Sequence, residues 1–375
     1  MSSVSDSSSS SDLIVVGAGI VGLAHAVAAV ERGLSVTVVE RDDRAVGASV
    51  RNFGHACITA QTGEALRFAE HARKTWLHLG ERAAFDVAEC GTVVVARSEE
   101  EFAALEELAA ERGRDQVRLL TSAETTEAAP VSADNLRGGA LLPLDLRVEQ
   151  RRACAAIAEW LAAQPGVEIL WSTTVLDVED GLVRTGRGTL RGDRVVVCAG
   201  HDLDRILPET AEEGGMRRCV LQMLQLRAPG VRLSPALLTG TSMLRYPALA
   251  ATEGARVLRA RLTEQRPELL SASVNHMMTQ LPCGDLVVGD THVYDRTPDP
   301  WSSEDFDELL LAETRALLGR DDLAVVRRWQ GVYASADGEF LRTRVSPGVT
   351  AVAVTSGIGM TTAFGLAPSV VDSLF

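Results

Sequence analysis

The chain has 375 residues, of which 46% are hydrophobic and 23% are charged, and its formal net charge is −14 at pH 7. This composition is ordinary for a globular protein, and the length favours two lobes over a single core. The acidic excess argues against a nucleic-acid partner, because nucleic-acid phosphates would be repelled. Residues 1–11, MSSVSDSSSSS, have neither a basic start nor an apolar stretch, so we predict a disordered leader and no secretory signal.

Cysteines and histidines show no metal-binding pattern. The six cysteines are scattered without any CxxC pair, which favours free thiols in a cytoplasmic protein. The seven histidines form no HxH or HExxH motif. His71 and His78 are spaced to share a helix face, but we expect no metal site there.

The stretch from residue 13 to residue 40, LIVVGAGIVGLAHAVAAVERGLSVTVVE, fits a nucleotide-binding strand–helix–strand unit. Gly17 allows the tight turn after the first strand, and Gly19 lets the backbone approach a pyrophosphate. Gly22 permits close packing of the helix against the strand. The first N–H groups of the helix are then free to hold phosphate.

Glu40 closes the second strand of this unit. A carboxylate about 20 residues beyond the glycines is the acceptor that a ribose 2′-hydroxyl needs, and it repels the extra phosphate of NADP. Two alternatives are a tight turn without a ligand and a membrane span, since residues 13–30 carry no Asp, Glu, Lys or Arg. The charged pair Glu31–Arg32, which leads directly into another strand, favours a soluble parallel sheet and no membrane span.

The rest of the chain alternates between helical and strand periodicity. We predict helices over residues 63–84, 98–113, 121–129, 147–163 and 303–318, and a closing helix after the glycine loop at 356–361. We predict strands over residues 90–96, 138–142, 167–178, 194–198, 325–333 and 349–355, and a strand-rich stretch from 220 to 295. The strand at 194–198 would return to the first sheet, so the interruption between the two halves indicates an inserted lobe.

Four segments carry a family resemblance: GAGIVG with Glu40–Arg41, GAS at 47–49, VVVCAG at 195–200 and SGIGMT at 356–361. Together they resemble the D-amino-acid oxidase superfamily of FAD enzymes, in its glycine oxidase and sarcosine oxidase branch, over almost all of the chain from Asp12. SVRNFGHA, DLRVE, GDTHVY and GMTTAFGLA look like a bacterial subgroup of FAD oxidoreductases that is often associated with aminophosphonate metabolism.

This resemblance implies an α/β fold in which a Rossmann-like FAD-binding domain carries an inserted α+β substrate domain with a large mixed or antiparallel sheet. The FAD-binding domain would comprise residues 12–87, 144–218 and 325–375. The substrate-binding domain would comprise residues 88–143 and 219–324, and its sheet would roof the isoalloxazine ring.

The resemblance also implies positions for the cofactor. Glu40 would hold the adenosine ribose, Arg41 would lie by the adenine, and Val175 would contact the adenine through its backbone. Ala48–Ser49 would meet the pyrophosphate, and residues 357–361 would line the flavin pyrimidine. The expected cofactor-binding residues are Gly17, Gly19, Ile20, Val21, Gly22, Glu40, Arg41, Ala48, Ser49, Gly54, His55, Val175, Ala199, Gly200, Gly357, Ile358, Gly359, Met360 and Thr361.

We expect the FAD to be bound without a covalent link. Monomeric sarcosine oxidases tether FAD to a cysteine near the C-terminal loop, and no cysteine lies beyond Cys283. Dimethylglycine dehydrogenase-like relatives use a histidine in the second loop, which invites comparison with His55, but the register of His55 differs.

The substrate contacts implied by the resemblance differ from those of the better-known relatives. Glycine and D-amino-acid oxidases have an arginine in the C-terminal loop that grips the substrate carboxylate, and Met360 stands at the matching place. Arg51 and Asn52 stand where relatives often carry small residues. Arg51 is the first candidate to anchor carboxylate or phosphonate oxygens. Alternatively, Arg51 neutralises the FAD pyrophosphate or pairs with a nearby acid.

The segment GDTHVYD supplies the catalytic candidates. His292 and Tyr294 are two residues apart, so on a strand they would project from one face together with Asp290. Sarcosine oxidase-like proteins have a histidine near the end of a corresponding strand, over the flavin. His276, Tyr246 and Tyr333 are weaker candidates.

These features predict an FAD-dependent amine oxidoreductase. It would oxidise the C–N bond of a small amine with an anionic group, such as an aminophosphonate or an N-substituted amino acid, to an imine that hydrolyses. Electrons would pass to O2, giving hydrogen peroxide, or to another acceptor. A flavin monooxygenase is an alternative, although it normally needs NADPH recognition and we find no second dinucleotide fingerprint. A flavoprotein without turnover is the other alternative.

Overall fold

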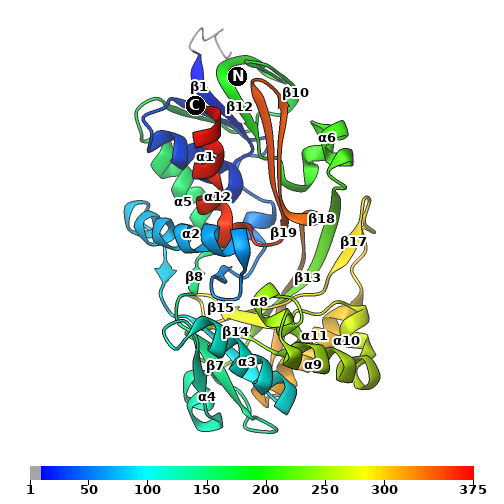
Figure 1. Cartoon of the computed structure of the whole chain (residues 1–375). Coiled ribbons are helices and arrows are strands. Elements are labelled where there is room, and N and C mark those ends of the chain that lie inside the picture. The colour runs from blue at the N-terminus through cyan, green and yellow to red at the C-terminus, as the bar shows by residue number, and fades with distance from the viewer. Residues whose placement is uncertain (1–9) are drawn as a thin grey trace.

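The computed structural model describes residues 10–375, and within them a mixed sheet of 16 strands runs the length of the molecule (Figure 1). The strands are β1 Ser11–Val16, β2 Val36–Val39, β3 His55–Ala56, β4 Val87–Ala88, β5 Thr92–Ala96, β6 Arg118–Leu120, β7 Gly138–Leu142, β8 Leu146–Val148, β9 Val167–Leu170, β10 Val175–Glu179, β11 Leu182–Thr185, β12 Gly188–Val197, β13 Arg217–Arg227, β14 Ala236–Leu238, β15 Met277–Gln280, β16 Leu286–Gly289, β17 Val293–Asp295, β18 Ala324–Ser346 and β19 Val349–Ser356. A smaller sheet has the order β3-β8-β4.

Helices cover both ends of the long sheet (Figure 1). The α-helices are α1 Ile20–Val30, α2 Gly63–Arg82, α3 Glu99–Arg112, α4 Ser122–Ala128, α5 Gln150–Ala162, α6 Pro208–Glu213, α7 Gly240–Met243, α8 Pro247–Ala250, α9 Glu253–Gln265, α10 Pro267–Ser271, α11 Glu304–Leu318 and α12 Gly359–Leu374. Two 3-10 helices are η1 Ala48–Val50 and η2 Gly200–Arg205.

The N-terminal unit forms as predicted. β1 and β2 pair in parallel, with Leu13 opposite Val36, and α1 connects them. The apolar stretch at 13–30 is thus a strand followed by an 11-residue helix that is buried on most sides. Among the helices of residues 10–375, none combines the length and the apolar character that a membrane crossing requires.

The long sheet has two halves of different character. In the order β19-β12-β1-β2-β9 every neighbouring pair is parallel, which is the pattern of a nucleotide-binding sheet. The order β6-β7-β5-β14-β15-β16-β13 is antiparallel except between β14 and β5. β18 joins the halves, because its first part pairs with β13 and its second part with β19.

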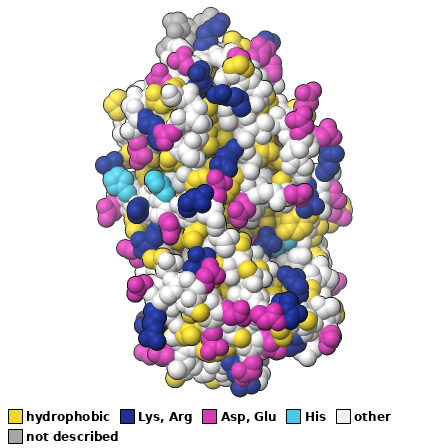
Figure 2. Space-filling model, in the orientation of Figure 1, with side chains coloured by type: hydrophobic (Ala, Val, Ile, Leu, Met, Phe, Trp, Pro, Cys, Tyr) yellow, Lys and Arg dark blue, Asp and Glu magenta, His cyan; other side chains and the backbone are white. Residues whose placement is uncertain are grey.

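Each half has its own core. The parallel half packs α1, α2, α5 and α12 around fully buried side chains that include Trp76 and Phe364, whose rings meet edge to face at 4.8 Å. In Figure 1, the red C-terminal helix α12 lies beside α1, close to the N-terminal strand. The other half packs α3, α9 and α11 against the antiparallel strands. On the face shown in Figure 2, acidic and basic side chains are interspersed without a field of one sign.

Several predicted boundaries are wrong. The strand predicted at 167–178 is two strands, β9 and β10, separated by a turn in which Ser172 has a φ of 52°. The helix predicted from residue 147 begins at Gln150, because residues 146–148 pair with β3 and β4 as strand β8. The strand predicted at 325–333 continues to Ser346.

The stretch 220–295 is not uniformly strand-rich, because four helices, α7 to α10, lie within it. Pro247 and Pro267 begin α8 and α10 at the helical position where a missing N–H costs nothing. Thr252 caps α9 by accepting the N–H of Ala255 at 3.1 Å. The predicted leader falls mainly on residues 1–9, outside the described residues, and Ser11 already belongs to β1. The predicted domain limits stay a prediction.

Candidate functional site

A cavity of about 820 Å³ opens at the carboxyl ends of β1 and β12, where the two halves of the sheet meet. Its volume falls within the range typical of small-molecule and cofactor sites. The sequence-predicted residues that line it are Gly17, Gly19, Ile20, Val21, Glu40, Arg41, Ala48, Ser49, Arg51, Asn52, His55, Val175, Ala199, Gly200, Tyr246, Asp290, His292, Tyr294, Tyr333, Gly357, Ile358, Gly359, Met360 and Thr361. Gly22 and Gly54, which were also predicted, are not among the residues that line the cavity.

The glycine loop has the close contacts that a dinucleotide site requires. Gly17 adopts a φ of +105°, and a Cβ there would lie 2.5 Å from the carbonyl oxygen of Cys198. A Cβ on Gly22 would overlap the carbonyl oxygen of Gly17, so the helix can approach the loop only without a side chain. At Gly19 the nearest atom to a Cβ is the hydroxyl of Ser49, at 3.2 Å, and this residue faces the cavity.

Glu40 and Ser49 hold the loop from the neighbouring strand and from η1. One carboxylate oxygen of Glu40 accepts the N–H of Ala18 at 2.8 Å, and the other accepts the N–H of Asp42 at 3.1 Å. The hydroxyl of Ser49 accepts the N–H of Ile20 at 2.9 Å. An ionised carboxylate has about four acceptor sites, so Glu40 keeps capacity for a ribose hydroxyl at the cavity wall.

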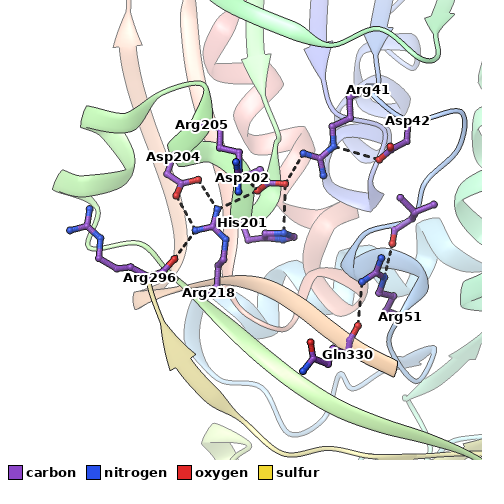
Figure 3. A network of polar contacts seen from close by, with 11 residues as sticks. Arg41, Asp42, Arg51, His201, Asp202, Asp204, Arg205, Arg218, Arg296 and Gln330 are labelled. Atoms are coloured by element: carbon purple, nitrogen blue, oxygen red, sulfur yellow. Dashed lines mark hydrogen bonds and ion pairs between the residues drawn. The ribbon is translucent and has the colours of Figure 1, made fainter. Parts of the chain in front are cut away.

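Arg41 belongs to a network of charges at the cavity edge (Figure 3). Its Nη1 lies 2.7 Å from Oδ2 of Asp202, whose other oxygen meets Arg205 at 2.9 Å and Arg218 at 3.2 Å. Burial alone would raise the pKa of Asp202, but His201, Arg41 and Arg205 lower that pKa to about 2. Asp202 is therefore ionised at neutral pH and holds Arg41 beside the cavity.

Arg51 and Asn52 line the cavity but also fix the loop that carries them. The Nε of Arg51 donates to the carbonyl of Val46 at 2.7 Å and its Nη1 donates to the carbonyl of Gln330 at 3.3 Å (Figure 3). Asn52 donates to two carbonyls of η1 and accepts the N–H of Gly54 at 2.7 Å. Arg51 is exposed, and within the part of the chain that the structure describes its Nη2 donates no hydrogen bond.

The C-terminal glycine loop leads into the N-terminus of α12 at the cavity wall. Gly357 adopts a φ of +79°, and a Cβ there would lie 3.0 Å from the ring of Tyr333. The carbonyl of Met360 accepts the indole N–H of buried Trp76 at 2.7 Å, which anchors the helix start. Unpaired N–H groups at a helix N-terminus favour negative charge on whatever faces them.

The roof of the cavity presents an arginine held by two tyrosines. Arg245, just after α7, donates from Nη1 to the hydroxyl of Tyr294 at 3.1 Å and from Nη2 to the hydroxyl of Tyr333 at 2.6 Å. The guanidinium of Arg217 lies 5.2 Å from the centre of the Tyr294 ring. The rings of His292 and Tyr294 stack with centres 6.3 Å apart. All five side chains line the same cavity.

Asp290, His292 and Tyr294 do not share one strand face, because β16 ends at Gly289 and β17 begins at Val293. His292 and Tyr294 are nevertheless brought together. Nδ1 of His292 lies 2.9 Å from the carbonyl of Ser273, which identifies that nitrogen as the donor. Burial, followed by the charge of Arg245, lowers the pKa of His292 well below its usual value, so His292 is neutral at pH 7.

Several cavity residues went unrecognised in the sequence, and two of them are polar side chains beside Asp290. Arg245 and Asn275 lie in stretches without any motif, and no local signal marks either of them. Both line the cavity, and Asn275 donates from Nδ2 to Oδ1 of Asp290 at 3.0 Å. Only the packing of α7 and of the segment before β15 brings them to Asp290.

His55 is a buried residue of the cavity lining and belongs to a hydrogen-bonded group with Thr92 and Asp145. Its Nε2 lies 2.7 Å from the hydroxyl of Thr92 and 3.3 Å from a carboxylate oxygen of Asp145. Burial would raise the pKa of Asp145, but hydrogen bonds from His55, Thr59 and Thr92 lower it.

Cys57 completes a His–Cys–Asp cluster with His55 and Asp145 whose ligand atoms lie within 4.8 Å of one another. Burial raises the pKa of the Cys57 thiol well above its usual value, which opposes the thiolate that a metal requires. His71 and His78 are both exposed on α2.

Comparison with known proteins identifies the fold. A family model described as FAD dependent oxidoreductase matches residues 12–372. L-proline dehydrogenase from P. horikoshii superposes with a TM-score of 0.79 at 18% identity, covering 97% of this chain and 92% of that chain. Glycine oxidase from Geobacillus kaustophilus gives 0.77 at 20%, covering 97% and 94%. Iminodiacetate oxidase from Chelativorans sp. BNC1 gives 0.75 at 19%, covering 96% and 95%.

Among curated proteins, the tRNA 5-methylaminomethyl-2-thiouridine biosynthesis bifunctional protein MnmC from Burkholderia mallei is similar to part of the chain. The two are 32% identical over 177 residues, which is 42% of this chain and 26% of that protein. The match thus takes in about a quarter of the length of this curated relative.

Proposed function

Because the chain belongs to the family of FAD-dependent oxidoreductases, we propose that it oxidises the C–N bond of a small amine that carries an anionic group. Aminophosphonates and N-substituted amino acids are the leading substrate classes. The main support is the charge of the cavity lining, in which Arg245 and Arg51 offer cationic donors and Asp290 offers a carboxyl group. Arginine recognises carboxylate and phosphonate oxygens through its forked N–H donors.

The residues present fit FAD. The close approach at Gly17 and Gly22, the carboxylate of Glu40 and the start of α1 suit the adenosine diphosphate part, and the start of α12 suits an electron-rich ring. When bound, FAD supplies an acceptor for the hydrogen and the electron pair that leave the carbon next to the amine nitrogen.

The side chains of the roof orient the substrate in this proposal. Arg245 holds the anionic group, and the two tyrosine hydroxyls keep Arg245 in position. His292 is neutral and therefore adds no competing positive charge beside the amine. The resulting imine hydrolyses to a carbonyl compound and an amine, and O2 or another acceptor takes up the electrons.

Anaerobic flavin reduction tests the proposal. The purified, yellow protein is mixed with 2-aminoethylphosphonate, with N-methylglycine and with ethylamine, a control amine that has no anionic group, and the loss of flavin absorbance is followed. We expect the anionic amines to bleach the flavin faster than ethylamine does. Equal bleaching by ethylamine would remove the anionic group from the proposal. Bleaching by NADPH alone would indicate a monooxygenase, and no bleaching at all would indicate a protein without turnover.

The two candidate anchors can be separated by substitution. We expect Arg51→Ala or Arg245→Ala to raise KM for an anionic amine by about 10- to 100-fold if that residue binds the anion, since a hydrogen bond to a charged group contributes about 1.5–3 kcal/mol. KM for ethylamine should change little. Arg191→Ala, at an exposed position on β12, is the matched control. Loss of flavin from the Arg51 variant would instead assign Arg51 to the cofactor.

We also propose that the protein works in the cytoplasm. All six cysteines are unpaired in the structure. A reducing compartment keeps thiols in that state.

A further inference from the structure

Asp290 is a buried carboxyl group without a charged partner. It is 4% exposed, and its backbone exchanges two hydrogen bonds of 2.8 Å with the backbone of Asn275, which fixes its position. Oδ1 accepts the Asn275 amide, whereas Oδ2 accepts no hydrogen bond among residues 10–375, and the nearest ring nitrogen, Nε2 of His292, is 3.8 Å away. No arginine or lysine of these residues lies within ion-pair distance of it. A buried carboxyl group on a cavity wall that lacks a cationic partner and has an oxygen without a hydrogen bond indicates a functional site.

Asn275 adds a second unsatisfied acceptor at the same place. The two hydrogens of its amide are directed at Oδ1 of Asp290, at 3.0 Å, and at the sulfur of Met277, at 3.5 Å. These contacts turn the amide oxygen away, and that oxygen is buried without any partner among the described residues. Asp290 and Asn275 both line the cavity, and each carries an oxygen that accepts no hydrogen bond among residues 10–375. A cation with several N–H donors would supply donors at this place.

Arg245 places a positive charge in the same cavity as the carboxyl group of Asp290. It lines the same cavity, and its hydrogen bonds go to the hydroxyls of Tyr294 and Tyr333 and not to an acid. A small molecule with an ammonium group at one end and an anionic group at the other matches this arrangement. The arginine and the carboxylate together would fix the orientation of such a molecule, whereas either group alone would bind only one of its two ends.

We propose that Asp290 and Asn275 form the ammonium-binding subsite of the cavity, and that Asp290 takes the proton that the substrate nitrogen must lose before it is oxidised. This inference rests on the proposed amine oxidation. In the step, an N–H bond of the ammonium breaks and an O–H bond forms on Asp290. The electron pair of the broken N–H bond stays on nitrogen, so this step is a proton transfer without oxidation or reduction. The resulting lone pair on nitrogen is then available to form the C=N bond.

The surroundings of Asp290 suit this role at neutral pH. Burial raises the pKa of Asp290 to about 7, although the charge of Arg245 opposes the shift. The other titratable groups that face it are His292, Tyr246 and Cys219, and burial keeps each of these neutral at pH 7. A general base is most effective when its pKa lies near the working pH. Below about pH 7, Asp290 is protonated and cannot accept the proton.

The test is the pH dependence of anaerobic flavin reduction in the Asp290→Asn variant. With the wild type we expect the reduction rate to rise through about pH 7 as Asp290 ionises. The variant must bind amine that is already unprotonated, so its rate should fall by on the order of 100-fold at pH 7 and recover towards the pKa of the free amine, about 10. A purely structural defect would lower the rate at every pH.

A second variant keeps the test decisive if Asp290→Asn does not fold or hold FAD. Asn275→Ala removes the neutral acceptor, and we expect a roughly tenfold higher KM for the amine. The rise of the rate should remain but move to higher pH, because the lost hydrogen bond from Asn275 no longer lowers the pKa of Asp290. Asp321→Asn, at an exposed position, is the matched control and should behave as the wild type.

The outcomes separate this inference from the proposed function. If the wild type is not reduced by any amine, the proposed function fails. If the wild type is reduced but Asp290→Asn keeps the same pH profile, or if Asn275→Ala keeps the parental KM, only the ammonium subsite is overturned.

Discussion

Gly22 shows how a single residue decides whether the cofactor loop can form. A methyl group there would overlap the carbonyl oxygen of Gly17, which is backbone and cannot rotate away. We expect Gly22→Ala to cost about 1–3 kcal/mol of overpacking and to weaken FAD binding by at least about tenfold. The flavin-to-protein ratio after gel filtration and a flavin titration measure this.

Gly186→Ala is the control for that substitution. A Cβ on Gly186 would meet nothing within 4 Å, and the residue lies outside the cavity lining. It should retain flavin as the wild type does. If Gly22→Ala retains flavin equally well, the close packing of loop and helix is not what holds the cofactor.

Site residues that belong to one short motif could be predicted from the sequence. Site residues that only tertiary packing brings together could not. Gly17 and Glu40 belong to one short motif whose spacing alone brings them to the same loop. Arg245 and Asn275 are brought to Asp290 only by the packing of segments that carry no motif. Arg51 was the more obvious anchor from its type and place, but the sequence could not reveal that two of its N–H groups go to backbone carbonyls.

At the scale of elements, the contact between α2 and α12 supports the cavity wall from behind. A Cβ on Gly365 of α12 would overlap backbone atoms of Phe68 in α2. We expect Gly365→Ala to force the helices apart and to lower the free energy of unfolding by about 1–3 kcal/mol. Urea unfolding followed by tryptophan fluorescence measures this, because Trp76 is buried between these helices.

Ser369→Ala adds no bulk and changes an exposed position on the same helix, so its unfolding midpoint should stay close to that of the wild type. An unchanged midpoint for Gly365→Ala would mean that α12 shifts without cost.

Helices and strands with a strong periodic pattern were predictable from the sequence. Very short helices and the full length of the longest strand were not. The unit of β1, α1 and β2 and the helix α11 match their predictions because period and end signals agree along the chain. The helices α7 and α8 have four residues each, too few for a period to be visible. The length of β18 depends on two different partner strands, which are distant in sequence.

For the molecule as a whole, the family, the mixed α/β fold and the dependence on FAD are confirmed. The physical reason is that the glycine motifs at both ends of the chain are short enough to recognise, and the structure brings both of them to one cavity. The substrate class and the domain limits stay predictions, because they depend on side chains and strand partners that no local pattern specifies.

We predict that the FAD is released when the protein is denatured. Acid precipitation should leave all of the flavin in the supernatant, and added FAD should raise the Tm in proportion to the logarithm of its concentration. A yellow pellet would show a covalent link. His55, which lines the cavity and whose Nδ1 has no partner among the described residues, would then be the first residue to substitute, by Asn.

The long strand β18 limits where the two halves of the sheet can bend. β18 pairs with β13 over residues 324–335 and with β19 at Ser335 and from Phe340 onwards, so its change of partner falls at residues 336–339, where the register shifts. Elsewhere along β18, bending would break ladder hydrogen bonds. We therefore expect any motion between the two halves during turnover to be confined to this short segment, whose residues also line the cavity.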